Sequence, residues 1–345
     1  MAAIVMADDG IVFDGDSLSS GPLGGAETAF VSLAEALAAR GHAVSIFNRC
    51  AAAMTRNGVA WQPLGDGLPD RADLYIANRG HRLLPGVKDA RRRVFWIHNP
   101  ADYLLKWRYL SKLWRWRPTV VFSGAYHAAS YPGWAPAGGR ETIPYGISEV
   151  FRTAGEPAAP PPPRAVFTSS PLRSLDWLLD VWARAIHPAV PEAELHLFSS
   201  PKTYGGHGDA RAAAMNTVLD RAFTLADRGV VLRQPVPKPA LAGEMSGFRT
   251  LLYRGDPGET FCLAVGESQA AGVPCVVQDI GCVAERVVDG VTGFVAPDDA
   301  AFAARAIALL TDDDLWRAQH RAARDLQNRW GWDDAAAAFE RLIPA

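Results

Sequence analysis

The sequence has few cysteines and no long apolar stretch. Its four cysteines show no C-x-x-C spacing, which argues against zinc-ribbon and thioredoxin-like sites. Cys262, Cys275 and Cys282 lie in one apolar region, so we expect reduced thiols in a protein core. No apolar stretch reaches the roughly 18 residues of a membrane-spanning helix, and no signal-peptide pattern opens the chain. These absences predict a cytoplasmic protein.

Neither sign of charge is in large excess. Lys and Arg number 35 against 37 Asp and Glu, which gives a formal net charge of -2. No overall field therefore favours nucleic acid, and we expect no nucleic-acid partner. Hydrophobic residues make up 49% of the 345 residues, enough for a large core and two domains. An anionic ligand must be held by local groups.

Short apolar segments alternate with amphipathic helical segments in both halves of the chain. In the helix expected at 26–39, Phe30, Leu33 and Leu37 share one face. Further helices are expected at 174–186 and 333–343. We expect strands at 4–6, 43–47, 74–76, 94–97, 120–122, 142–144, 165–168, 195–199, 230–232, 250–253 and 273–278. The alternation predicts an α/β fold with parallel sheets covered by helices on both faces.

A run of four prolines at 160–163 separates the two halves. Such a run favours extended polyproline II and excludes a helix or a central strand. We therefore expect a first Rossmann-like domain at 1–153, a linker at 154–164 and a second Rossmann-like domain at 165–330. The C-terminal segment 331–345 is expected to form a helix that packs back on the first domain.

A glycine-rich loop at 19–25 leads into the first long helix. Gly24 and Gly25 allow a ligand to approach the main chain, and the helix N-terminus offers unpaired N–H groups to a phosphate. A flexible surface turn explains the loop equally well. Neither a G-x-G-x-x-G motif after the first strand nor a P-loop lysine is present, which disfavours an oxidoreductase or an NTPase.

The segment 258–274 is the most informative part of the sequence. Glu259 and Glu267 are eight residues apart, the first in a loop and the second in the helix that follows. Thr260 is the expected N-cap of this helix and Gly272 its end. Two carboxylates in this setting can accept hydrogen bonds from the hydroxyl groups of a sugar. The backbone N–H groups at the start of the helix would face the ligand at Phe261, Cys262 and Leu263.

This segment resembles the E-x7-E signature of glycosyltransferase family 4, whose members have the GT-B fold of two Rossmann-like domains facing across a deep cleft. Segments 24–27, 41–42, 142–147 and 281–297 resemble further motifs of that family, although Tyr145 stands where the family has Asn. The resemblance implies retaining, metal-independent transfer of a sugar from a UDP- or GDP-linked donor. The implied acceptor is a glycan or a lipid-linked acceptor in cell-envelope polysaccharide synthesis, and no further cofactor is implied.

The resemblance also assigns roles to single residues. Glu259 would contact the donor sugar and Glu267 the ribose, while Gly25 and the backbone of 261–263 would meet the diphosphate. The family uses an Arg and a Lys against the diphosphate. Arg173 matches the Lys, but the Arg position holds Ser169 or Ser170. Arg173 alone is then the expected catalytic cation.

Two more residues follow the carboxyl ends of expected strands, where open α/β sheets bind ligands. His98 resembles the family histidine beside the donor sugar, although a histidine at a strand end is more often structural. Arg233 is expected to border the nucleotide base. Together with Glu259 and Arg173, His98 completes the expected catalytic set.

A basic, aromatic segment spans 106–117, with five cations and no acid. Trp and Tyr interleaved with Arg and Lys suit an anionic bilayer surface, which would make the protein peripheral on the inner membrane. An ordinary helix with Leu110, Leu113 and Trp114 in the core explains the pattern equally well.

Other functions remain open at this stage. An epimerase or a phosphorylase can share the fold, although no candidate for the cofactor lysine of a phosphorylase stands out. The missing Arg also permits a non-catalytic protein that binds nucleotide sugars. Slow hydrolysis of a donor by the purified protein would separate a transferase from such a binding protein.

Overall fold

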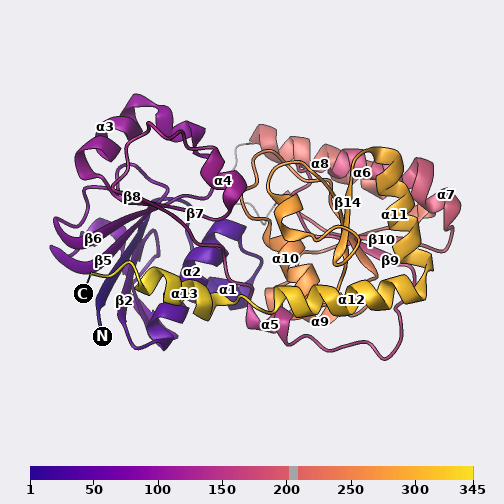
Figure 1. Ribbon diagram of the computed structural model, residues 1–345, viewed down its shortest axis with the longest axis horizontal. Helices are drawn as coiled ribbons and strands as arrows, with labels where there is room; N and C mark the ends of the chain where they lie inside the picture. Colours follow the sequence, from indigo (N-terminus) through magenta and orange to yellow (C-terminus); the bar gives the residue numbers. More distant parts are fainter. Residues whose placement is uncertain (202–208, 345) are drawn as a thin grey trace. The chain divides into compact units, whose positions relative to one another are not determined.

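The computed structural model describes residues 1–201 and 209–344. Contacts divide these residues into two units (Figure 1). The first unit comprises residues 1–20, 25–146 and 330–345, and the second comprises residues 21–24 and 147–329. Each unit is built around one sheet.

The first unit has an eight-stranded sheet in the order β3-β4-β2-β1-β5-β6-β7-β8, parallel except for the β3–β4 pair. The inner strands β1 and β5 are buried at nearly every position, as expected for a parallel sheet covered on both faces. The strands are β1 (Ala3–Asp8), β2 (Ala43–Asn48), β3 (Met54–Arg56), β4 (Val59–Pro63), β5 (Arg71–Asn78), β6 (Asp89–Trp96), β7 (Thr119–Phe122) and β8 (Gly139–Thr142). The α-helices are α1 (Ser17–Ser20), α2 (Gly25–Ala39), α3 (Trp107–Trp116), α4 (Ala125–Ala129) and α13 (Trp332–Glu340).

The second unit has a six-stranded, all-parallel sheet in the order β11-β10-β9-β12-β13-β14. Its strands are β9 (Arg164–Phe167), β10 (Glu194–Phe198), β11 (Val230–Arg233), β12 (Thr250–Leu252), β13 (Cys275–Gln278) and β14 (Gly293–Ala296). Its α-helices are α5 (Glu149–Arg152), α6 (Leu175–Val181), α7 (His187–Ala189), α8 (Asp209–Phe223), α9 (Lys238–Met245), α10 (Leu263–Ala270), α11 (Asp299–Thr311) and α12 (Asp313–Gln327). A π-helical turn, Trp182–Ile186, joins α6 to α7.

Most of the expected elements are present. Phe30, Leu33 and Leu37 of α2 are fully buried, which confirms the amphipathic prediction. The strand expected at 142–144 is wrong, because β8 ends at Thr142 and is an exposed edge strand of polar residues. The sequence analysis also missed β3, β4 and β14.

The proline-rich segment packs on the second unit instead of standing apart. Helix α5 contacts α9 and α10. Arg249 Nε donates to the carbonyl of Pro161 at 2.6 Å, and Arg324 Nη1 donates to the carbonyl of Ala154 at 2.9 Å. These bonds from buried or half-buried guanidinium groups hold 147–163 to this unit.

The C-terminal helix lies in the first unit. Helix α13 packs on α2 (Figure 1). Arg40, just after α2, bonds Asp333 at 2.9 Å and Glu340 at 2.6 Å. The chain therefore leaves the first unit after Gly146 and returns to it at Trp330.

Cys262, Cys275 and Cys282 are free and buried, as expected, and so is Cys50. Burial raises the pKa of Cys275 and Cys282 well above that of an ordinary thiol. In the described part of the chain, no helix is both long and apolar enough to cross a membrane.

Candidate functional site

In the second unit, Glu259 is held by two donors. Its carboxylate accepts hydrogen bonds from the Arg173 guanidinium and from the Tyr253 hydroxyl, the latter at 2.6 Å. Burial raises the pKa of Glu259, and the attraction of Arg173 offsets part of that rise. The sequence placed Arg173 and Glu259 in one site, and the structure brings them into direct contact.

Two glycines set the loop that carries Glu259. A Cβ on Gly255, at φ 107°, would lie 2.4 Å from the carbonyl oxygen of Ile280. One on Gly281, at φ 70°, would lie 2.2 Å from the carbonyl oxygen of Asp256. Only glycine permits this backbone-to-backbone approach, so the loop at 255–259 and the turn at 279–282 pack directly together.

Helix α10 begins two residues later than the sequence suggested. Its N-cap is Cys262, not Thr260, and its first helical residue is Leu263. Cys262 adopts a left-handed conformation, φ 61°, which costs energy for a residue with a Cβ. This left-handed residue changes the direction of the chain between the Glu259 loop and helix α10. The helix ends as expected, with Gly272 left-handed just beyond it.

Glu267 lies in the second turn of α10 and is buried. Its carboxylate accepts a hydrogen bond from the ammonium group of Lys238, at the start of α9. Burial raises the pKa of Glu267, and Lys238 opposes that rise. The sequence analysis missed Lys238, which is 29 residues away in the chain and carries no motif.

The other residues expected to bind the donor lie at the ends of strands and helices or in loops. Arg233 ends β11, where its guanidinium pairs with both carboxylate oxygens of Glu244 at 2.6 and 2.8 Å. Gly25 is the first residue of α2, and Gly24 precedes it. Ser170 is buried, and its hydroxyl has no hydrogen-bond partner within the described ranges.

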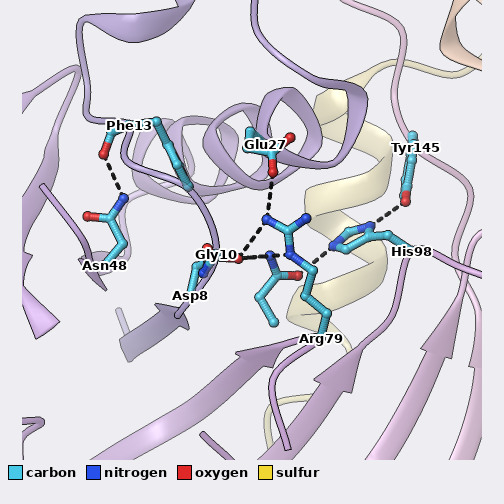
Figure 2. A network of polar contacts seen from close by, with 9 residues as sticks. Asp8, Gly10, Phe13, Glu27, Asn48, Arg79, His98 and Tyr145 are labelled. Carbon is cyan, nitrogen blue, oxygen red and sulfur yellow. Dashed lines mark hydrogen bonds and ion pairs between the residues drawn. The ribbon is translucent and has the colours of Figure 1, made fainter. Parts of the chain in front are cut away.

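The first unit carries a buried polar network at the carboxyl ends of β1, β5 and β6 (Figure 2). Arg79 bridges two carboxylates: its Nη2 lies 2.6 Å from Glu27 Oε1 and 3.1 Å from Asp8 Oδ2. Burial works against the charged form of Arg79, but Asp8 and Glu27 outweigh it and raise the pKa. Asn78 also donates to Asp8 at 2.5 Å. Nothing in the sequence pattern predicted the roles of Asp8, Asn78 and Arg79.

His98 belongs to the same network (Figure 2). Its Nε2 lies 2.5 Å from Asn78 Oδ1, and its Nδ1 contacts the Tyr145 hydroxyl. Because Asn78 Oδ1 can only accept, Nε2 carries the proton and Nδ1 accepts from Tyr145. Burial, helped by Arg79, lowers the pKa of His98 well below its ordinary value. His98 is therefore a neutral imidazole with a fixed tautomer.

In the described ranges, no group of three or more His, Cys, Asp or Glu side chains could hold a metal ion.

Part of this chain is similar in sequence to known proteins. Residues 163–312, which include Arg173, Glu259 and Glu267, match the model of the family described as glycosyl transferases group 1. A D-inositol 3-phosphate glycosyltransferase of Streptomyces avermitilis is 37% identical over 172 residues, which is 48% of this chain and 36% of that protein. A relative with the same description from Xylanimonas cellulosilytica is 39% identical over 83 residues, 24% of this chain and 20% of that protein. The chain thus spans well under half of the length of these relatives.

Solved structures give the fold. Sucrose-phosphate synthase from Thermosynechococcus elongatus superposes with a TM-score of 0.72 at 18% identity, covering 99% of this chain and 98% of that chain. Anabaena HepE in complex with UDP-glucose gives a TM-score of 0.72 at 15% identity, covering 99% of both chains. The fold is GT-B.

Proposed function

We propose that this protein is a retaining glycosyltransferase of family 4. It moves a sugar from a UDP- or GDP-linked donor to a glycan or lipid-linked acceptor, in the synthesis of a cell-envelope polysaccharide. It uses neither a metal ion nor a further cofactor. The observation that carries the proposal is the contact of Arg173 and Tyr253 with Glu259, within a segment that matches glycosyl transferases group 1.

The chemistry of these groups suits a sugar diphosphate. Glu259, fixed by its two donors, presents carboxylate oxygens that can accept bonds from sugar hydroxyls. Arg173 and the N-terminal N–H groups of α10 favour the negative charge of a diphosphate. Buried Glu267 offers a carboxylate for the ribose hydroxyls.

The proposed reaction is a front-face displacement. The bond from the anomeric carbon to the diphosphate oxygen breaks while the acceptor oxygen bonds to the same face of that carbon. The acceptor proton passes to the leaving diphosphate. Negative charge grows on the diphosphate as it leaves, and Arg173 stabilises that charge.

The test begins with the donor. A panel of UDP-, GDP- and ADP-sugars is screened by thermal shift, because a ligand that binds the native state raises Tm. Hydrolysis or transfer of the donor that binds is then followed for wild type, Arg173→Ala and the control Arg305→Ala. We expect Arg173→Ala to lower kcat by about 100-fold or more, as loss of a charge-stabilising donor does.

Three results would each count against a part of the proposed function. Unchanged turnover in Arg173→Ala would remove Arg173 from the mechanism. Binding of a nucleotide sugar with neither hydrolysis nor transfer would favour the non-catalytic alternative. If no nucleotide sugar raises Tm, the proposed function is wrong.

Helix α3 supports a second part of the proposal, docking on an anionic membrane. Trp107 and Trp114 are seven residues apart on this helix and 79% and 73% exposed. An Arg follows each of them, at 108 and 115. Leu113 is buried, but the expectation that Trp114 lies in the core is wrong. Exposed Trp rings beside Arg suit the interface of an anionic bilayer.

Liposome sedimentation tests this part. With phosphatidylserine-containing vesicles at low salt, wild type is expected to pellet, and the double variant Trp107→Ala/Trp114→Ala to stay in the supernatant. Salt should weaken the binding because the charges at the surface are screened. Trp134→Ala is the control, since Trp134 is 71% exposed but lies outside α3. Equal sedimentation of all three proteins would refute docking through α3.

A further inference from the structure

Arg286 lies beside the loop that follows Glu259. It ends a 3-10 turn, Val283–Arg286, and its guanidinium carbon is 4.5 Å from the centroid of the Phe261 ring. The glycine contacts that join 255–259 to 279–282 bring this turn to the loop. Arg286 is thus placed next to the segment expected to meet the diphosphate.

The Arg286 guanidinium has no acceptor among the residues that the structure describes. Within residues 1–201 and 209–344 it makes no hydrogen bond and no ion pair, whereas Arg173, Arg233 and Arg249 of the same unit all pair with carboxylates. Burial lowers the pKa of Arg286, and its exposed neighbour Glu285 opposes that effect without reaching ion-pair distance. A partly desolvated cation without a counterion is unfavourable, and an anion placed beside it relieves the cost.

The same unit lacks a cation where the resemblance leads us to expect one. Ser169 and Ser170 stand at the position of the family Arg, and the buried Ser170 hydroxyl has no partner in the described chain. Arg173, the remaining cation at this position, already shares its charge with Glu259. A diphosphate carries several negative charges, and a guanidinium can pair with its oxygens through charge-assisted hydrogen bonds.

We propose that Arg286 supplies the second positive charge for the diphosphate of the donor, in place of the missing arginine. The cation comes from the 283–286 turn instead of the start of α6. The Phe261 ring holds the guanidinium by a cation–π contact while its N–H groups stay available to phosphate oxygens. This inference rests on the proposed function.

The test compares wild type, Arg286→Gln and Arg305→Gln. Arg305 is a matched control, because its guanidinium carbon lies 4.7 Å from the Phe294 ring in the same unit. Titrations with UDP and GDP are followed by tryptophan fluorescence, with uridine and guanosine as probes that lack phosphate. We expect Arg286→Gln to weaken diphosphate binding about 10- to 100-fold and nucleoside binding hardly at all, as loss of hydrogen bonds between charged groups predicts. Arg305→Gln should bind like wild type.

A second readout separates binding from structure. Without nucleotide, Arg286→Gln should have a Tm equal to or above that of wild type, because it removes an uncompensated cation. Arg286→Lys keeps the charge and should recover part of the diphosphate affinity.

The outcomes are distinct. If wild type binds neither UDP nor GDP, the proposed function fails, and the inference fails with it. If wild type binds one of them and Arg286→Gln binds it equally well, the inference alone is overturned. A lowered Tm together with an equal loss of nucleoside binding would also overturn it, since Arg286 would then be structural.

Discussion

Lys238 and Glu267 form an ion pair in which the carboxylate is nearly fully buried and the ammonium group mostly so. Burial alone would favour a protonated Glu267, and Lys238 is the cation that opposes this effect. If Glu267 binds ribose hydroxyls, Lys238 acts through it, by keeping it ionised and in place.

Lys238→Met should therefore destabilise the protein in a pH-dependent way. It leaves a buried carboxylate without its cation, at a cost of about 3 kcal/mol in the free energy of unfolding at neutral pH. Since the pKa of Glu267 is already raised and rises further in the variant, the folded state holds its proton to higher pH than the unfolded state does. The free energy of unfolding of the variant then falls as pH rises above the ordinary pKa of a glutamate. The destabilisation by Lys238→Met should therefore be larger at pH 8 than at pH 5.

Urea unfolding at both pH values measures this. Arg164→Met is the control, because the Arg164–Glu194 pair has 41% and 38% of its side chains exposed and should lose at most about 1 kcal/mol. If Lys238→Met lowered the free energy of unfolding equally at pH 5 and pH 8, Glu267 would not be the group whose charge Lys238 stabilises.

The residues that the sequence could identify are those with a local signature. Glu259 and Glu267 stand in a motif, and Arg173 precedes a helix start. Tyr253 and Lys238 have no such signature, because each reaches its carboxylate only after the strands of the second unit have paired. Arg79, which joins β5 to the start of α2, was missed for the same reason.

At the scale of elements, periodicity found most inner strands and the edge strand β11, but it missed β3, β4 and β14. The hairpin of β3 and β4 had a readable signal in Asn57-Gly58, both left-handed at φ 48° and 77°, which suits a two-residue hairpin turn. The sequence could not predict where α10 begins. Thr is a preferred N-cap residue and Cys is not, yet the loop conformation makes Cys262 the N-cap instead of Thr260.

Gly281→Ala should disrupt the junction of the Glu259 loop with the turn before Arg286. The new Cβ would meet the Asp256 carbonyl and add left-handed strain, which together cost about 2–4 kcal/mol. Gly243→Ala in α9 is the control, since its Cβ meets nothing within 4 Å and should stabilise the helix by about 1 kcal/mol. Urea unfolding compares the two, and a Gly281→Ala variant as stable as wild type would show that the two loops can part without cost.

At the scale of the whole molecule, the α/β alternation was enough to predict two sheets. The grouping of 147–163 with the second unit was not predictable, because it depends on guanidinium bonds to carbonyls far away in the chain. A run of prolines states that a segment is extended, not which unit it packs on.

The return of the chain to the first unit makes α13 part of that unit's core. Phe339 is buried, and its ring centroid lies 5.1 Å from that of Trp96. Phe339→Ala should cost the first unit about 3–5 kcal/mol, as truncation of a buried aromatic residue does. Hydrogen exchange followed by mass spectrometry reports each unit separately, so exchange should quicken in β1, β5 and β6 but not in β9, β10 and β12. Phe302→Ala, at a fully buried site in the second unit, should give the reverse pattern. If both variants quickened exchange equally in both units, the two units would unfold as one, and α13 would stabilise the whole chain instead of its own sheet.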